Sequence, residues 1–195
     1  MSPLFAWTED EADPSWAWIT KVPKPLAQQD WKLATGYPSA SWVPASVVID
    51  LAKDKGEKLA DAVPTAVYLL VLSEKLCTLL TRESGARWET FAVKLRRDRK
   101  VLDTSYVLAN LLDVAPCVDL GKSDYEPNAV IPGEVEFFRR LVLDPGRLPR
   151  DRKIFRMKEQ PRIILVRDDL VQAIRDAGCT GMTFVPAEQI GPELG

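Results

Sequence analysis

The sequence contains no histidine. Histidine is the general base of Ser–His–Asp and Cys–His catalysis and a frequent zinc ligand, so its absence excludes these enzymes and His-containing zinc sites. Cysteine is also scarce. Cys77, Cys117 and Cys179 are isolated, and no two have the CxxC spacing of a thiolate metal site or redox pair. Neither GxGxxG nor GxxxxGK[ST] occurs, so no phosphate-binding loop is predicted. We therefore expect no metal, no cofactor and no catalytic constellation of these kinds.

Long hydrophobic runs are absent as well. No apolar run approaches the roughly 20 residues that span a bilayer. The first residues lack the basic and then apolar segments of a secretory signal, so we expect neither a membrane protein nor a secreted one. Apolar residues make up 46% of the 195-residue chain and charged residues 28%, as in ordinary globular domains. An odd number of cysteines flanked by apolar residues suits a reducing compartment, and the expected localisation is cytoplasmic.

The clearest structural pattern that is present lies in residues 162–186. Residues 163–166 form an apolar, β-branched run that predicts a buried strand. Asp168 is the expected N-cap of a helix whose apolar residues follow at helical spacing, and Gly178 is the expected helix end. Residues 182–186 predict a second strand. The unit is strand, helix, strand, close to the shortest crossover that parallel strands allow.

Residues 68–92 repeat this plan. Without gaps, Leu69 falls on Ile163 and Leu76 on Leu170, with Ser73 as the N-cap and Gly85 at the helix exit. In this comparison the predicted caps and exits are not in perfect register. Any two amphipathic strand–helix units also share an apolar period. Duplication and coincidence therefore both stay open.

Strands outnumber helices in the rest of the chain. Further strands are predicted at residues 91–95, 118–120, 134–143 and 154–157, with a basic turn at 96–100. The expected fold class is therefore α+β, with mixed α/β as the alternative: a single domain with two strand–helix–strand units.

The N-terminal part differs in composition. Residues 1–45 hold five of the six tryptophans and six prolines, which disfavour long helices, yet indoles are too apolar to leave in water. We expect residues 1–60 to form a Trp/Pro-rich region of short strands and extended segments. This region is expected to pack on a core made by residues 61–195.

Two stretches are candidate partner-binding surfaces. The first is a Trp/acidic segment, because residues 1–20 contain four acids and no basic residue. The second is residues 139–158, where eight Arg or Lys against Asp144 and Asp151 give a net charge of +6. Exposed aromatics and arginines concentrate binding energy, whereas solvated turns are the alternative for the basic stretch. The candidate residues are Trp7, Glu9, Asp10, Glu11, Trp16, Trp18, Arg147, Arg150 and Arg152.

Several strings together resemble a known family. They are YVLANLLDVAPCVDLGKSDYE (106–126), LVLD (141–144), IFRM (154–157) and RIILVRDDLVQAIRDAGCTGMTFVP (162–186). Their succession resembles the immunity-protein family of myxobacterial type, whose members are found beside bacterial polymorphic toxins. The resemblance covers residues 64–187. Arg167 departs from the usual Ser at the strand–helix junction, and residues 1–60 carry no matching motif.

This resemblance implies a cytoplasmic protein that binds and blocks a cognate toxin encoded nearby, without catalysis. Two other functional hypotheses stay open. One is a carboxylate-dependent hydrolase or transferase that uses acids of residues 119–126 and 168–169. The other, less favoured, is a regulatory module that binds nucleic acid through the basic residues of 94–100 and 139–158. An acidic interface would suit a nucleic-acid-cleaving toxin and a basic interface an acidic one, and the sequence does not choose between them.

Overall fold

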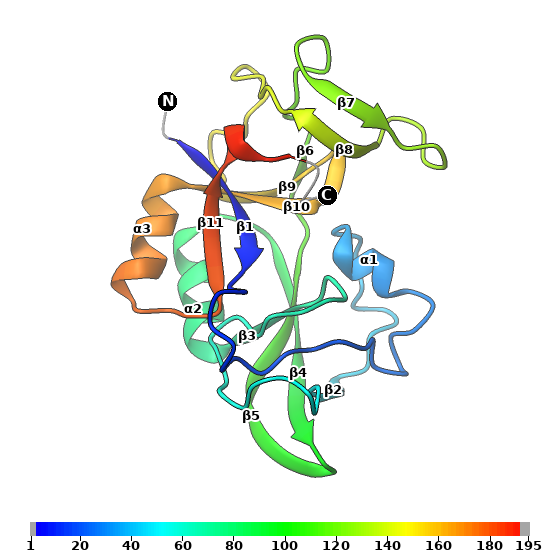
Figure 1. Cartoon of the computed structure of the whole chain (residues 1–195), viewed down its shortest axis with the longest axis vertical. Coiled ribbons are helices and arrows are strands. Elements are labelled where there is room, and N and C mark those ends of the chain that lie inside the picture. The colour runs from blue at the N-terminus through cyan, green and yellow to red at the C-terminus, as the bar shows by residue number, and fades with distance from the viewer. Residues whose placement is uncertain (1–2, 192–195) are drawn as a thin grey trace.

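The computed structural model describes residues 3–191. Its strands form a five-stranded sheet, a four-stranded sheet and a two-stranded hairpin, and most of its helical residues lie in two helices (Figure 1). In chain order the elements are β1 (Leu4–Glu9), α1 (Asp30–Ala34), β2 (Ser46–Asp50), β3 (Leu70–Ser73), α2 (Glu74–Glu83), β4 (Trp88–Arg97), β5 (Lys100–Leu111), β6 (Val114–Ala115), β7 (Asp124–Pro127), β8 (Val135–Arg140), β9 (Ile154–Met157), β10 (Gln160–Arg167), α3 (Asp168–Asp176), β11 (Met182–Pro186) and the 3₁₀ helix η1 (Ala187–Gln189). This strand-rich arrangement is compatible with the α+β class. None of the helices in the described part is long and apolar enough to cross a membrane.

The two predicted strand–helix–strand units have the same topology. β10 and β11 both pair antiparallel with β1, which lies between them in the sheet order β11-β1-β10-β9-β6. β3 and β4 both pair antiparallel with β5, in the order β2-β4-β5-β3. In each unit, therefore, the helix joins two parallel strands that are separated by one antiparallel strand. The predicted crossover is present, but it skips a strand.

The helix starts differ in one respect from the sequence prediction. The Ser73 hydroxyl caps α2 and accepts a hydrogen bond from the Leu76 amide at 3.2 Å, as predicted. The N-cap of α3 is Arg167 and not Asp168, because pairing with β1 keeps Arg167 in the extended conformation of β10. Asp168 and Asp169 instead occupy the first turn, where the helix dipole favours carboxylates. Arg167 is the residue that falls on Ser73 in the ungapped comparison, so the correction brings the two helix starts into register.

Both helices bury their apolar stripe in one shared core. Leu76 and Leu80 of α2 pack in the same cluster as Leu170 and Ile174 of α3, and Figure 1 shows the two helices beside each other. Gly178 follows the C-cap of α3 with φ +61°, a conformation that glycine adopts without steric cost. The predicted helix end is thus confirmed.

The N-terminal segment contributes a strand to the interior of the five-stranded sheet. The sequence predicted short strands in this region but not that β1 separates β10 from β11. Further along, Trp16 forms a bridge with Lys58, and Ile19 forms one with Thr65. These pairings place the irregular segment that follows β1 against residues 58–65.

Arg156 does not fit the interpretation of the basic stretch 139–158 as solvated turns, and the strand predicted at residues 154–157 is present. Arg156 is in β9, only 2% exposed. Its guanidinium donates to four backbone carbonyl oxygens, those of Leu111 at 3.1 Å, Ala34 at 2.7 Å, Pro161 at 3.0 Å and Leu33 at 2.9 Å. Burial lowers the pKa of Arg156 to about 9, so the side chain remains a cation at neutral pH. Arg156 therefore ties the end of α1 to both large sheets.

Candidate partner-binding cleft

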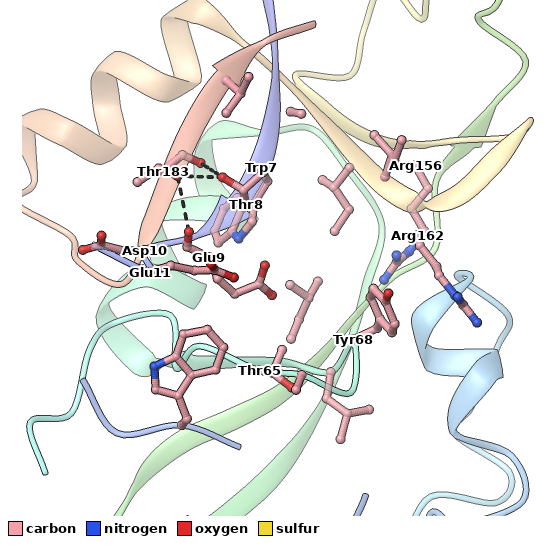
Figure 2. A pocket seen from close by; sticks show the side chains of 18 of the residues that line it. Trp7, Thr8, Glu9, Asp10, Glu11, Thr65, Tyr68, Arg156, Arg162 and Thr183 are labelled. Atoms are coloured by element: carbon pink, nitrogen blue, oxygen red, sulfur yellow. Dashed lines mark hydrogen bonds between the residues drawn. The ribbon is translucent and has the colours of Figure 1, made fainter. Parts of the chain in front are cut away.

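A cleft of about 880 Å³ opens between the five-stranded sheet and the segment 65–70 that leads into β3. One end is acidic and carries Glu9, Asp10 and Glu11, and the other end carries Tyr68 and Arg162, as Figure 2 shows. The lining set includes five of the candidate partner-binding residues, namely Trp7, Glu9, Asp10, Glu11 and Trp18.

The acidic end is held in place by backbone and indole contacts. The Trp16 indole Nε1 donates to Asp10 Oδ2 at 2.9 Å, and the Asp10 amide donates to the Gly181 carbonyl at 3.3 Å. Gly181 has φ +90°, and a Cβ there would lie 2.0 Å from the Ala62 carbonyl oxygen. Only glycine fits where the backbone of residue 181 approaches that of Ala62 so closely. The hydrogen bond from Asp10 to Gly181 then fixes the position at which the chain leaves β1.

Glu9 and Glu11 carry charge without a cationic partner. Neither side chain forms an ion pair with the residues that the structure describes, although both line the cleft. Burial raises the pKa of Glu9 above its ordinary value, a hydrogen bond from its own backbone opposes this, and the Glu11 charge adds to the rise. A desolvated carboxylate with a perturbed pKa in a cleft is typical of a functional site.

The three tryptophans of the Trp/acidic segment occupy different positions. Trp7 lines the cleft and packs edge-on against Phe184 of β11, with ring centroids 5.7 Å apart. Trp16 is 4% exposed and lies behind the surface, where it holds Asp10. Trp18 lines the cleft and also a neighbouring depression of about 600 Å³.

That second depression extends the acidic surface. Asp13 and Asp54 line it together with Glu11, and Lys55 is the basic residue among its lining. The Lys55 Nζ lies 5.4 Å from the centroid of the Trp18 ring. Trp18 and Glu11 line both hollows, so the two form one continuous surface.

The wall opposite the acids was not predicted from the sequence. The Arg162 guanidinium stacks on the Tyr68 ring at 4.7 Å from its centroid. Tyr68 is 47% exposed and has φ +55°, a left-handed conformation that is uncommon for an aromatic residue. Arg162 directly precedes the apolar run 163–166, and no sequence motif marked this wall.

The family model for the Immunity protein family (Imm11) matches residues 9–189. The chain belongs to the Imm11 immunity protein family. The match begins at Glu9 and therefore covers most of the cleft as well as the core. It also extends the resemblance found in residues 64–187 to most of the N-terminal region. A comparison with curated proteins found no match.

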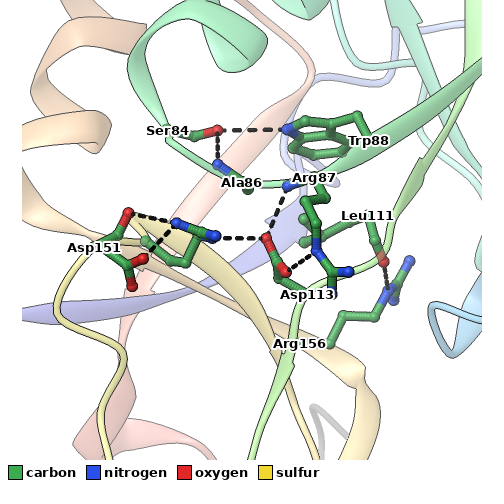
Figure 3. Close-up of polar contacts among 9 residues, drawn as sticks. Ser84, Ala86, Arg87, Trp88, Leu111, Asp113, Asp151 and Arg156 are labelled. Carbon is green, nitrogen blue, oxygen red and sulfur yellow. Dashed lines mark hydrogen bonds and ion pairs between the residues drawn. The ribbon is translucent and has the colours of Figure 1, made fainter.

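In this Imm11 member the candidate residues Arg147, Arg150 and Arg152 of the basic stretch lie outside the cleft lining. Arg147 pairs with Asp144 at 3.2 Å, whereas Arg150 is exposed on the connection between β8 and β9. Arg152 pairs with Asp113 at 3.0 Å and with Asp151 at 2.7 Å. Arg152 is therefore held by two carboxylates of its own chain. Figure 3 labels these two acids together with Arg87, the other arginine that contacts Asp113.

Asp113 is the centre of that contact. It accepts hydrogen bonds from the Arg87 amide at 2.7 Å, the Arg87 Nε at 2.8 Å and the Arg152 Nε at 3.0 Å. Burial by itself would raise the pKa of Asp113, but the hydrogen bonds from Arg87 and the charges of Arg87 and Arg152 outweigh it and lower the pKa. The network fastens the 151–153 segment to the end of β5.

Of the five acids of the enzyme hypothesis, all except Asp168 are engaged in local ion pairs. Asp119 pairs with Lys122 at 2.8 Å, Asp124 with Arg139 at 3.2 Å, and Asp169 with Lys153 at 2.9 Å. None of them is among the residues that line the cleft. Among the described residues, no group of three or more acids or cysteines is placed to hold a metal ion.

Proposed function

We propose that this Imm11 family member neutralises a toxin protein by forming a stoichiometric complex with it, without turnover. Family membership supports the immunity role. The observation that carries the binding mode is the position of Trp7, the acids of residues 9–11 and Trp18, which line an open cleft. An inhibitor of this kind needs a stable fold and a complementary surface, but no catalytic residues.

The cleft is the favoured interface because of the residue types it displays. Trp, Tyr and Arg dominate the hot spots of protein interfaces, especially in concave regions that exclude water. Trp7, Trp18, Tyr68 and Arg162 bring these types together around one hollow. By contrast, Arg147 and Arg152 of the basic surface already have carboxylate partners. A specific complex should bury about 1,200–2,000 Å² in total.

The test is co-expression with the toxin whose gene lies nearest, followed by co-purification and measurement of the mass of the eluted species. We expect cells to survive and a complex of fixed stoichiometry to elute. The matched control is Asp124→Asn, which removes a carboxylate outside the cleft and should still protect. Protection without any complex, together with loss of protection in a normally folded Asp124→Asn, would establish the enzyme hypothesis instead.

A further inference from the structure

We propose that the cleft receives a protruding segment of the toxin whose lysine or arginine side chain enters between Glu9, Glu11 and Trp18. This inference rests on the proposed function and adds to it the chemistry of the partner. It assigns the acidic end of the cleft as the specificity-determining part of the interface.

The shape of the cleft selects a protruding segment. A hollow of about 880 Å³ lies within the size range of ligand-binding pockets, and it has walls from the five-stranded sheet on one side and residues 65–70 on the other. A flat partner surface would leave this hollow filled with water. A loop or hairpin of the toxin can enter it and bury Trp7 and Tyr68, two of the aromatic side chains that line it.

The charges select a cation. A neutral or apolar segment would desolvate Glu9 further and would cover the exposed Glu11 without a counter-charge, and uncompensated burial of a carboxylate is strongly unfavourable. A phosphate or nucleic acid would be repelled by the same carboxylates. A Lys or Arg side chain offsets the desolvation through charge-assisted hydrogen bonds.

The Trp18 ring adds a second interaction suited to a cation. Its face already attracts one ammonium group, that of Lys55, with Nζ 5.4 Å from the ring centroid. An indole beside unpaired carboxylates is the combination that attracts an alkylammonium or guanidinium, because ring quadrupole and carboxylate charge act in the same direction. Glu11 and Trp18 both line the cleft and the adjoining depression, so a cation of the toxin can approach these two side chains from either hollow.

The opposite end of the cleft sets the orientation of the bound toxin segment. Arg162, stacked on Tyr68, places positive charge at the far end of the cleft. A bound segment therefore meets carboxylates at one end and a guanidinium at the other. The complementary toxin segment has its Lys or Arg at the acidic end and carbonyl or carboxylate oxygens at the Arg162 end.

The test measures the affinity of the purified full-length chain for its toxin at several salt concentrations. The variant is Glu9→Gln with Glu11→Gln, and the matched control is Glu83→Gln with Glu126→Gln, which removes two surface carboxylates elsewhere. We expect the cleft variant to lose about tenfold or more in affinity and to show a weaker salt dependence, with the control within about twofold of wild type. Circular dichroism and thermal unfolding establish that each variant is folded.

The outcomes separate this inference from the proposed function. If wild type binds no toxin, the proposed function itself fails. If wild type binds and the cleft variant binds equally well, the toxin uses another surface and the cation inference is overturned. If the wild-type chain self-associates and the cleft variant abolishes this without changing toxin affinity, the cleft is an interface between two copies, which also overturns the inference. A single Arg162→Gln variant should weaken toxin binding less than the double glutamate variant does. The toxin oxygens expected at the Arg162 end include neutral carbonyls, to which a glutamine amide can still donate.

Discussion

At the residue scale, Arg156 shows that a basic residue in a basic stretch need not be a surface charge. Its neighbours in sequence, Arg152 and Lys153, pair with acids, whereas Arg156 is enclosed and satisfied by carbonyl dipoles alone. Composition could not reveal this, because the carbonyls of Leu33 and Ala34 come from a segment more than a hundred residues earlier. The sequence pattern IFRM predicted the strand β9, but it did not predict that Arg156 is buried.

We predict that Arg156→Met lowers the free energy of unfolding by about 3 kcal/mol or more, because the four carbonyl groups lose their donor and each unsatisfied group costs about 1–3 kcal/mol. Urea denaturation followed by circular dichroism measures the change. Arg147→Met is the control, since an exposed ion pair contributes about 0–1 kcal/mol. Equal stability of Arg156→Met and wild type would contradict the anchoring role.

Glu9 gives a residue-scale prediction with a pH sign. Its pKa is raised in the folded chain by burial and by Glu11, so ionisation of Glu9 opposes folding. The contribution of Glu9 to the free energy of unfolding is therefore most favourable below the pKa that Glu9 has in the unfolded chain. It decreases as the pH rises through the higher pKa of Glu9 in the folded chain. Glu9→Gln should therefore raise the melting temperature of the free protein at pH 7 but not at a pH well below 4. A lower melting temperature for Glu9→Gln at both pH values would show that the carboxylate stabilises the fold.

At the element scale, local patterns predicted α2 and α3 and the strands that these two helices join. The apolar spacing of α2 and α3 and the glycine after α3 depend on nearby residues, so they could be read from the sequence. The N-cap of α3 could not, because Asp168 is a good cap by type, while pairing of Arg167 with Leu4 decides the helix start. Local sequence patterns also could not predict the central position of β1, because this position depends on pairing with residues near the other end of the chain.

The position of β1 leads to a prediction for truncation and proteolysis. Removing residues 1–10 would leave β10 and β11 without the strand that joins them, so the shortened chain should lose cooperative unfolding. Limited proteolysis of the intact protein should likewise spare residues 1–45. Rapid cleavage before Ala45 that leaves a folded remainder would contradict both expectations and would make residues 1–60 a separable region.

At the scale of the whole molecule, the candidate site arises where distant segments meet. The acidic half of the cleft could be predicted, because four acids and several tryptophans without a basic residue stand out in residues 1–20. The other half could not, because Tyr68 and Arg162 carry no motif and are brought together by the sheets. The helices of the two strand–helix–strand units share one hydrophobic core, and the cleft lies beside the sheet that β1 completes.

The central claim is that the toxin binds in this cleft. Hydrogen–deuterium exchange of the chain with and without its toxin tests it most directly, because exchange slows where a partner covers the backbone. We predict slower exchange in residues 8–12 and 65–70 in the complex, and unchanged exchange in residues 144–151. Slower exchange confined to residues 144–151, with residues 8–12 and 65–70 unchanged, would contradict this account and assign binding to the basic surface.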